Sequence, residues 1–145
     1  MFKHILVPTD GSPLSEAAIS HAVEFAKSIG ARITGVHVIP AFHTFDYRAE
    51  MLEDTRQQFE KDSRAHAQRF LAKIEQAAQE AGVECSTLLA THDHPYEAII
   101  ETARETGCDA IVMASHGRKG IKALLMGSET QKVLTHSTIP VLVYR

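Results

Sequence analysis

Residues 114–130 have the composition of a phosphate-binding segment. The stretch reads ASHGRKGIKALLMGSET and contains three glycines, Gly117, Gly120 and Gly127. A glycine lets the backbone approach a ligand closely because it has no Cβ atom. We expect a helix to begin after Gly127, and the free N–H groups and the dipole of a helix start attract anions. These residue types therefore predict a site for a phosphate group.

Positive charge is concentrated in the same segment. Arg118, Lys119 and Lys122 lie there, and residues 115–145 carry five basic side chains and one acidic side chain, Glu129. Residues 1–114 carry ten basic and 17 acidic side chains, so the whole chain has a net charge of −3 and a pI of about 6.3. This balance disfavours a dedicated nucleic-acid-binding protein. It fits a small anion that binds at one place on a mildly acidic protein.

The same residues also have a purely structural interpretation. Ser128, with Gln131 three residues later, fits a capping box at a helix start. Gly127 is then a turn residue, and the basic side chains form a solvated face. The segment is not a Walker A loop, since G-x-x-x-x-G-K-S/T is absent, and not a dinucleotide-binding fingerprint, since its glycines follow a predicted fourth strand. The pattern alone leaves both interpretations open.

Apolar periodicity predicts that strands and helices alternate along the chain. Strands are expected at 4–8, 32–39, 83–90, 108–114 and 139–144. Helices are expected from Pro13 to Gly30, from about residue 50 to Gly82, from Pro95 to Gly107, and after Gly127. Ser12 is a suitable N-cap for the first helix, and glycine is a common residue just past a helix end.

This alternation predicts an α/β fold, a single doubly wound five-stranded parallel sheet with helices on both faces, as one domain over residues 1–145. In such a sheet, ligands bind at the carboxyl ends of the strands near the switch point. The candidate strand ends are Pro8-Thr9-Asp10 and 114–117. The Asp10 carboxylate can accept hydrogen bonds from ribose hydroxyls or hold a divalent cation through water.

Several histidines have structural interpretations. His92 and His94 flank Asp93 just before Pro95, and a metal site would need further ligands. We therefore expect a loop that leads into a helix, with Asp93 or His94 as its cap. His37 alternates with valines and is expected to be a hydrogen-bonded strand residue.

No catalytic nucleophile is predicted. Cys85 and Cys108 form no C-x-x-C pair, and both fall in expected strands, where a free thiol is usually a small core residue. His116 lies inside the glycine segment, where its structural role would be a hydrogen bond to backbone. Ser115 precedes it, but adjacent side chains rarely face each other, and no carboxylate can be assigned to orient such a pair.

The two ends of the chain suggest location and partner. The apolar run at 5–7 is too short for a signal peptide, and no window has the apolar length of a transmembrane helix. We therefore expect a cytoplasmic protein without membrane contact. The last strand, VLVY, is apolar, and an exposed edge of this kind promotes aggregation. Pairing with the same strand of a second copy would cover it in a homodimer.

Together these segments resemble the universal stress protein A family over essentially the whole chain. The resemblance is carried by HILVPTDGS, VHVI, DAIVMASHGRKG and LLMGSETQKVLTHSTIPVLVY. The nucleotide-binding branch has the signature G-x-x-G-x9-G-S/T, and this chain has Ala114, Gly117, Gly127 and Ser128 at the fixed positions. The departure is Ala114 in place of the first glycine. It would cost on the order of 1 kcal/mol at a positive φ and almost nothing at an ordinary strand end.

The resemblance implies a regulatory stress-response protein that binds ATP, with a divalent cation such as Mg or Mn, and forms homodimers. Any ATP hydrolysis would be slow. The base and ribose would be lined by residues from two strand ends: Pro8, Thr9, Asp10, Met113 and Ala114. Asp10 would lie near the ribose or the metal, and Val38 would meet adenine through its backbone.

The phosphate groups would lie at the second half of the signature. His116 and Gly117 would sit under the phosphates, and Gly127 and Ser128 would bind them. Glu129 and Thr130 would extend the cradle at the helix start. One alternative is a dimeric interaction module of the same fold that no longer uses nucleotide. Another is an enzyme of the wider adenine nucleotide α-hydrolase-like fold that transfers adenylyl or phosphoryl groups.

Overall fold

A parallel sheet forms the centre of the molecule. The computed structural model describes residues 1–41, 49–117 and 126–145, and at 49–52 the backbone alone. Within these ranges five strands form one sheet: β1 (His4–Pro8), β2 (Arg32–Ile39), β3 (Cys85–Thr91), β4 (Ala110–Ala114) and β5 (Val141–Tyr144). The strand order is β3-β2-β1-β4-β5, and every pair is parallel. This order confirms the predicted doubly wound sheet, with its switch point between β1 and β4.

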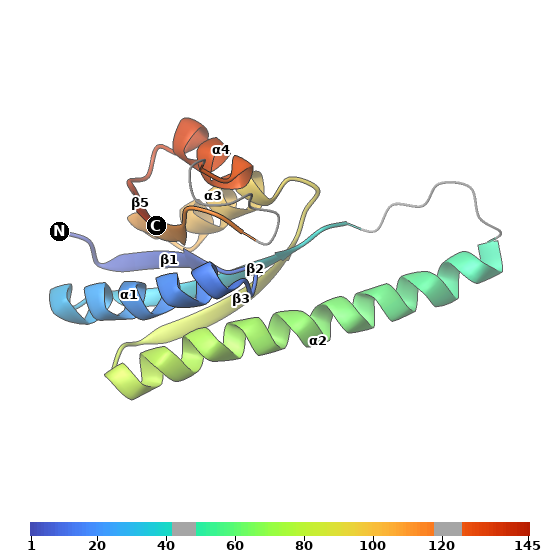
Figure 1. The fold of residues 1–145 in the computed structure, drawn as a ribbon, viewed down its shortest axis with the longest axis horizontal. Helices are drawn as coiled ribbons and strands as arrows, with labels where there is room; N and C mark the ends of the chain where they lie inside the picture. The colour runs from blue at the N-terminus through green and yellow to red at the C-terminus, as the bar shows by residue number, and fades with distance from the viewer. Residues whose placement is uncertain (42–48, 118–125) are drawn as a thin grey trace.

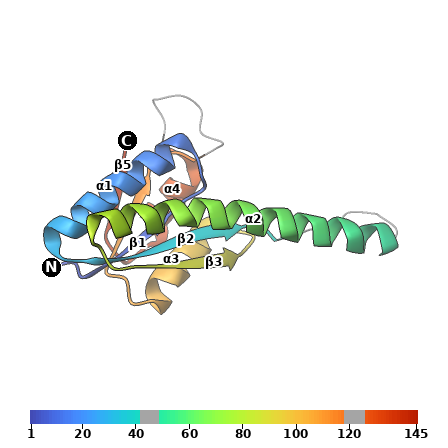
Figure 2. The ribbon, with the colours of Figure 1, turned by 90° about the horizontal axis from the view of Figure 1, so that it is seen from below.

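Helices cover both faces of the sheet (Figures 1 and 2). Two of them, α1 (Pro13–Ile29) and α2 (Ala49–Ala81), pack on one face, and α3 (Pro95–Glu105) and α4 (Ser128–His136) pack on the other. Adjacent residues of the central strand β1 divide between the two cores: Ile5 and Val7 join the first, and Leu6 joins the second. A strand buried on both faces reads as a continuous apolar run, which explains the ILV sequence of β1.

The predicted ends of α1 are confirmed. Ser12 is the N-cap, and its hydroxyl accepts the Ser15 N–H at 3.2 Å. Gly30 ends the helix at a φ of 69°, a left-handed conformation that suits glycine.

Three strands begin two residues later than predicted, β3 at Cys85, β4 at Ala110 and β5 at Val141. For β3 and β4 the preceding residues still belong to helix ends: the Val83 N–H donates to Ala78 and the Cys108 N–H to Ala103, both at 2.8 Å. These hydrogen bonds keep both segments in a helix-closing turn, so each strand starts only after the turn ends. Cys108 is buried but lies outside β4, contrary to the prediction.

The long helix α2 packs on the sheet through its C-terminal half. Ala67, Ile74 and Ala78 are fully buried, and Gly35 of β2 lets the helix approach, since a Cβ there would lie 2.8 Å from the Ile74 side chain. The N-terminal part of α2 runs out beyond the sheet in both views (Figures 1 and 2). Over the described part of the chain, no helix combines the length and the apolar character needed to cross a membrane.

Candidate functional site

A cavity of about 690 Å³ lies where β1, β2 and β4 end. We call it the strand-end cavity. Its size is typical of small-molecule sites, and its place beside the switch point is where ligands bind in sheets of this kind. Its walls bring together the twelve residues that the family resemblance placed around the nucleotide: Pro8, Thr9, Asp10, Val38, Met113, Ala114, His116, Gly117, Gly127, Ser128, Glu129 and Thr130.

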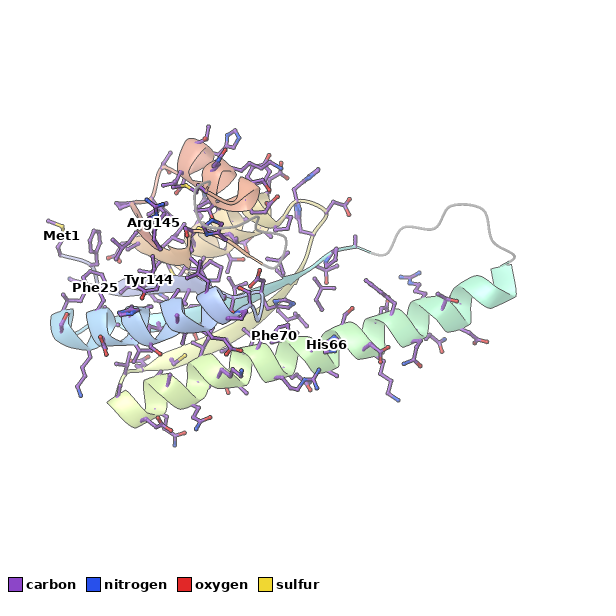
Figure 3. All side chains as sticks on the ribbon, in the orientation of Figure 1. Met1, Phe25, His66, Phe70, Tyr144 and Arg145 are labelled. Atoms are coloured by element: carbon purple, nitrogen blue, oxygen red, sulfur yellow. The ribbon has the colours of Figure 1, made fainter. Side chains whose placement is uncertain are left out.

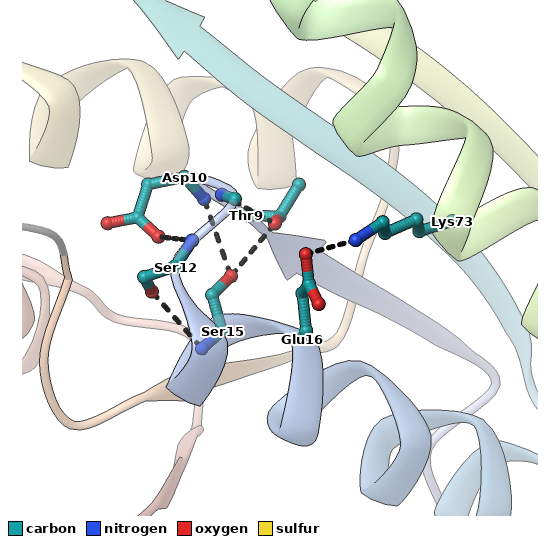
Figure 4. A network of polar contacts seen from close by, with 7 residues as sticks. Thr9, Asp10, Ser12, Ser15, Glu16 and Lys73 are labelled. Carbon is teal, nitrogen blue, oxygen red and sulfur yellow. Dashed lines mark hydrogen bonds and ion pairs between the residues drawn. The ribbon is translucent and has the colours of Figure 1, made fainter.

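The turn between β1 and α1 is held by a dense set of hydrogen bonds (Figure 4). The Thr9 hydroxyl oxygen accepts from the Ser15 hydroxyl at 2.8 Å and from the Gly11 N–H at 3.2 Å. Asp10 Oδ1 accepts the Ser12 N–H at 2.9 Å. The sequence T-D-G-S thus forms a local Asx-type turn that fixes the Asp10 carboxylate at the cavity wall.

Two glycines let the strand-end loops meet. A Cβ at Gly117 would lie 2.2 Å from Asp10 Oδ2, so the loop after β4 touches the Asp10 carboxylate because residue 117 has no side chain. Gly127 donates its N–H to the Ser115 carbonyl at 2.7 Å, and a Cβ there would lie 3.1 Å from that oxygen. The close approach at Gly127 is therefore to protein backbone. Gly120, Arg118, Lys119 and Lys122 lie outside the described residues.

The identity of Ala114 introduces no backbone strain. Ala114 is the last residue of β4 and pairs with Tyr144 of β5, so its backbone is extended. An extended alanine avoids the cost that a left-handed conformation would carry. The departure from the family signature therefore adds a methyl group at the cavity wall and leaves the backbone conformation unstrained.

The start of α4 differs from the predicted capping box. Gly127 is the N-cap, no side chain caps this helix start, and the Gln131 side chain donates to the Met126 carbonyl at 3.0 Å. The capping box with Ser128 as its first residue, which was part of the structural interpretation of this segment, is therefore not formed. Because no side chain of the described residues caps this helix, its first N–H groups stay available as donors, which is what an anion site needs.

The next two residues of α4 join it to its neighbours. The Thr130 hydroxyl donates to the Ala114 carbonyl at 2.9 Å. Glu129 accepts the Tyr96 N–H at 3.0 Å and so caps the first turn of α3. His94 occupies the expected N-cap position of α3, but its side chain makes no capping bond. Glu129 and Thr130 therefore hold α4 against α3 and β4, a role that the sequence did not predict.

His116 differs from its predicted environment. The Ser115 hydroxyl and His116 Nδ1 lie 2.8 Å apart, so these adjacent side chains do face each other, and the expected backbone hydrogen bond is not the one formed. His116 Nε2 is buried and has no partner among the described residues. Ser115 is 1% exposed. The pair therefore has no accessible hydroxyl, and within the part of the chain that the structure describes it has no orienting carboxylate, the features of a catalytic triad.

The sequence missed the cavity wall formed by α2. Ser63, His66 and Phe70 line the cavity. Figure 3 shows His66 and Phe70 close together on α2, and their rings stack with centroids 6.3 Å apart. Helical periodicity places Phe70 on the inner face of its helix but carries no signal for which strand end it reaches.

His37 and Val38 occupy the end of β2. His37 Nδ1 lies 2.7 Å from the Thr9 carbonyl, which confirms the predicted hydrogen-bonded strand histidine, and the residue also lines the cavity. The β1–β2 pairing ends at Pro8 opposite Val36, with the Thr9 N–H bonded to the Val36 carbonyl. Since backbone groups alternate in direction along a strand, the Val38 N–H and C=O turn to this same side, past the end of β1.

Comparison with known proteins identifies the family. The model of the universal stress protein family matches residues 1–145. Universal stress protein YxiE of Bacillus subtilis is 31% identical over the full length of both chains. The solved structure of protein MJ0577 superposes with a TM-score of 0.82 at 29% identity and covers 99% of this chain and 95% of its own. A universal stress protein from Archaeoglobus fulgidus, solved in complex with dAMP, shares the fold at 20% identity, with a TM-score of 0.71 over 100% of this chain and 98% of its own. This chain belongs to the universal stress protein family.

Proposed function

We propose that this protein binds an adenine nucleotide, ATP with Mg or Mn, in the strand-end cavity. It would act in the cytoplasm as a regulatory protein of the stress response, with ATP hydrolysis slow at most. The observation that carries the proposal is a convergence on one cavity of three groups that have no partner among the described residues: the N–H groups of an uncapped helix start, a buried ring nitrogen and an open backbone edge. The three come from different parts of the chain: the helix start and the ring nitrogen match the phosphates, and the backbone edge matches the base.

The base would bind at the end of β2. The Val38 N–H and C=O present a donor and an acceptor on one side of the strand. Adenine offers the complementary pair, an acceptor at N1 and a donor at the N6 amino group. Guanine has the opposite polarity at these two positions, so its donor and acceptor would meet like groups. Unpaired polar groups of this kind give strong discrimination between ligands.

The phosphates would bind at the start of α4. The N–H groups at Ser128 and after it supply donors, and the helix dipole favours negative charge. His116 Nε2 supplies a further group, because a buried nitrogen that has no partner within the described ranges is satisfied when a ligand oxygen reaches it. Asp10 would reach a metal ion through water and the bound nucleotide. When present, the metal would neutralise phosphate charge.

The dAMP complex supports the proposal from outside the chain. That protein has the same fold and holds an adenine nucleotide. The natural test is a thermal shift with ATP·Mg²⁺ and GTP·Mg²⁺. ATP at 100 times its dissociation constant should stabilise the protein by roughly 2.7 kcal/mol, and GTP at the same concentration should stabilise it far less. No shift with either nucleotide would favour the interaction module that does not use nucleotide.

A homodimer through β5 is part of the same proposal. β5 lies at the edge of the sheet, and its Leu142 side chain is 52% exposed. A second copy of β5 would cover both the backbone edge and this side chain. Sedimentation at micromolar concentration should give a dimer, and Leu142→Lys should give a monomer of unchanged secondary structure. A wild-type protein that sediments as a monomer would contradict this part of the proposal.

A further inference from the structure

The backbone hydrogen bonds between β1 and β2 end at Thr9 in the described part of the chain. Along a parallel pair of strands, a hydrogen bond donated by an N–H group of one strand is followed by one donated by an N–H group of the other strand. The Thr9 N–H donates to the Val36 carbonyl at 2.9 Å, so the next rung would join the Val38 N–H to the Thr9 carbonyl. Over the described residues, no backbone bond continues this ladder past Thr9.

A side chain takes the place of the missing rung. The Thr9 carbonyl oxygen lies 2.7 Å from His37 Nδ1. A carbonyl oxygen can only accept, so Nδ1 carries the proton and donates it. His37 is the residue just before Val38 on the same strand, and its ring reaches across to the oxygen that Val38 would otherwise use.

The position of the His37 ring is fixed from α2. Phe70 contacts the ring edge to face, with centroids 5.2 Å apart and an angle of 69° between the planes. The same Phe70 ring packs on Gly11, where a Cβ would lie 2.2 Å from it. Gly11 has a φ of 75°, so the chain turns sharply just after Thr9. Phe70 therefore packs against both the turn after Thr9 and the His37 imidazole that is hydrogen-bonded to Thr9.

We infer that His37 is a positioning residue, which binds the Thr9 carbonyl and thereby leaves the Val38 N–H open for the acceptor atom of a bound base. The inference deepens the proposed function, and its consequence for binding rests on that function. Its structural part does not, because the Val38 N–H is open or closed whether or not a ligand is present. His37 itself need not touch the ligand.

The test measures the Val38 amide directly. Hydrogen exchange of the Val38 amide would be followed by NMR in the ligand-free wild type and in three variants. His37→Leu removes the donor, and His37→Asn keeps an N–H donor at the same number of bonds from Cβ. His66→Leu is the matched control, since it removes an imidazole from the α2 wall of the same cavity and leaves the donor to the Thr9 carbonyl in place. We expect exchange to slow about tenfold or more in His37→Leu, because the released carbonyl closes the ladder, and to stay fast in the other two.

Binding supplies the second readout. His37→Leu should weaken ATP binding about tenfold, the effect of one lost hydrogen bond to the base. It should not change the binding of 1-deaza-ATP, which lacks the N1 acceptor, and His37→Asn should restore ATP affinity. Equal Val38 exchange in wild type and His37→Leu would overturn the inference. Failure of the wild type to bind any adenine nucleotide would overturn the proposed function, and the exchange result would still decide the role of His37.

Discussion

Each end of the sheet holds a histidine in which one ring nitrogen is hydrogen-bonded and the other is not. At the amino end, His4 Nε2 lies 2.7 Å from the Thr34 hydroxyl, and His4 Nδ1 is buried without a partner. At the carboxyl end, His116 Nδ1 lies 2.8 Å from the Ser115 hydroxyl, and His116 Nε2 is buried without a partner. These partner assignments refer to the described part of the chain. The local chemistry is nearly the same, so the surroundings make the difference.

The amino end is closed by the protein itself. His4 is 7% exposed, and the Thr34 hydroxyl that contacts it also lies 3.1 Å from the Ser86 hydroxyl. The Asp109 carboxylate accepts the backbone N–H groups of Lys3 and His4, at 2.9 Å and 3.0 Å. Although desolvation opposes it, these bonds lower the pKa of Asp109. His116, in contrast, lines the strand-end cavity. An unpaired nitrogen therefore costs stability at the closed end and is available to a ligand at the open end.

The largest effect should come from adding a side chain at Gly127, where the start of α4 meets the loop after β4. Gly127→Val would place its side chain against the backbone of Ser115 and His116, which leave 3.1–3.2 Å for a Cβ. The start of α4 would have to move away from the loop after β4. We expect ATP affinity to fall about 100-fold and the free energy of unfolding to fall by about 1–3 kcal/mol. Calorimetric titration and urea denaturation measure the two effects.

Gly127→Ala gives the graded control for this prediction. Its single methyl group should produce a smaller loss of both affinity and stability. Unchanged ATP binding in Gly127→Val would show that the ligand does not depend on this junction and that the site is misplaced.

The next effect should separate the two histidines. His116→Asn and His4→Gln each keep a polar atom near the bonded hydroxyl and remove the imidazole. We expect His116→Asn to weaken ATP binding about tenfold, since a hydrogen bond to phosphate is lost. His4→Gln should leave the dissociation constant unchanged. Equal effects of the two substitutions on titration with ATP would end the distinction between an open and a closed end.

The smallest effect should be a pH dependence of stability that belongs to the closed end. Burial, with Arg32 nearby, lowers the pKa of His4 from its ordinary value of 6.5. As the pH falls through 6.5, His4 becomes protonated in the unfolded chain but stays neutral in the folded protein. Stability is therefore lost on acidification, from that pH down to the folded-state pKa.

His4→Gln isolates this contribution because the other histidines remain. Between about pH 7.5 and about pH 5.5, the wild type should lose more free energy of unfolding than His4→Gln. Parallel losses in the two proteins, measured by urea denaturation at each pH, would show that His4 binds protons equally in both states.

The fold was predictable because its signals are local. Apolar runs marked the strands, Ser12 and Pro13 marked a helix start, and glycines marked helix ends. The two strand-end segments, 8–10 and 114–117, followed from one topological rule, since the carboxyl ends of parallel strands near the switch point share an edge of the sheet. Thr9 and Asp10 could thus be placed beside Gly117 although more than 100 residues separate them. The roles of Val38, Met113, Glu129 and Thr130 came from the resemblance to the family.

The parts that sequence reasoning missed depend on tertiary packing. Phe70 reaches the turn after β1 because α2 crosses the sheet at a particular angle, and no local pattern encodes that angle. Glu129 caps α3 across 33 residues of sequence. The bond between Ser115 and His116 depends on side-chain rotamers at the end of a strand. Such contacts between distant or irregular segments decide which polar groups stay open.

We expect the open polar groups of the strand-end cavity to bind an adenine nucleotide, and a crystal structure of the protein with ATP and Mg²⁺ would show whether they do. The base should lie on the Val38 backbone, and phosphate oxygens should lie within hydrogen-bonding distance of the Ser128 N–H and His116 Nε2. A nucleotide bound elsewhere on the protein, or a cavity without nucleotide at saturating ATP, would contradict this expectation.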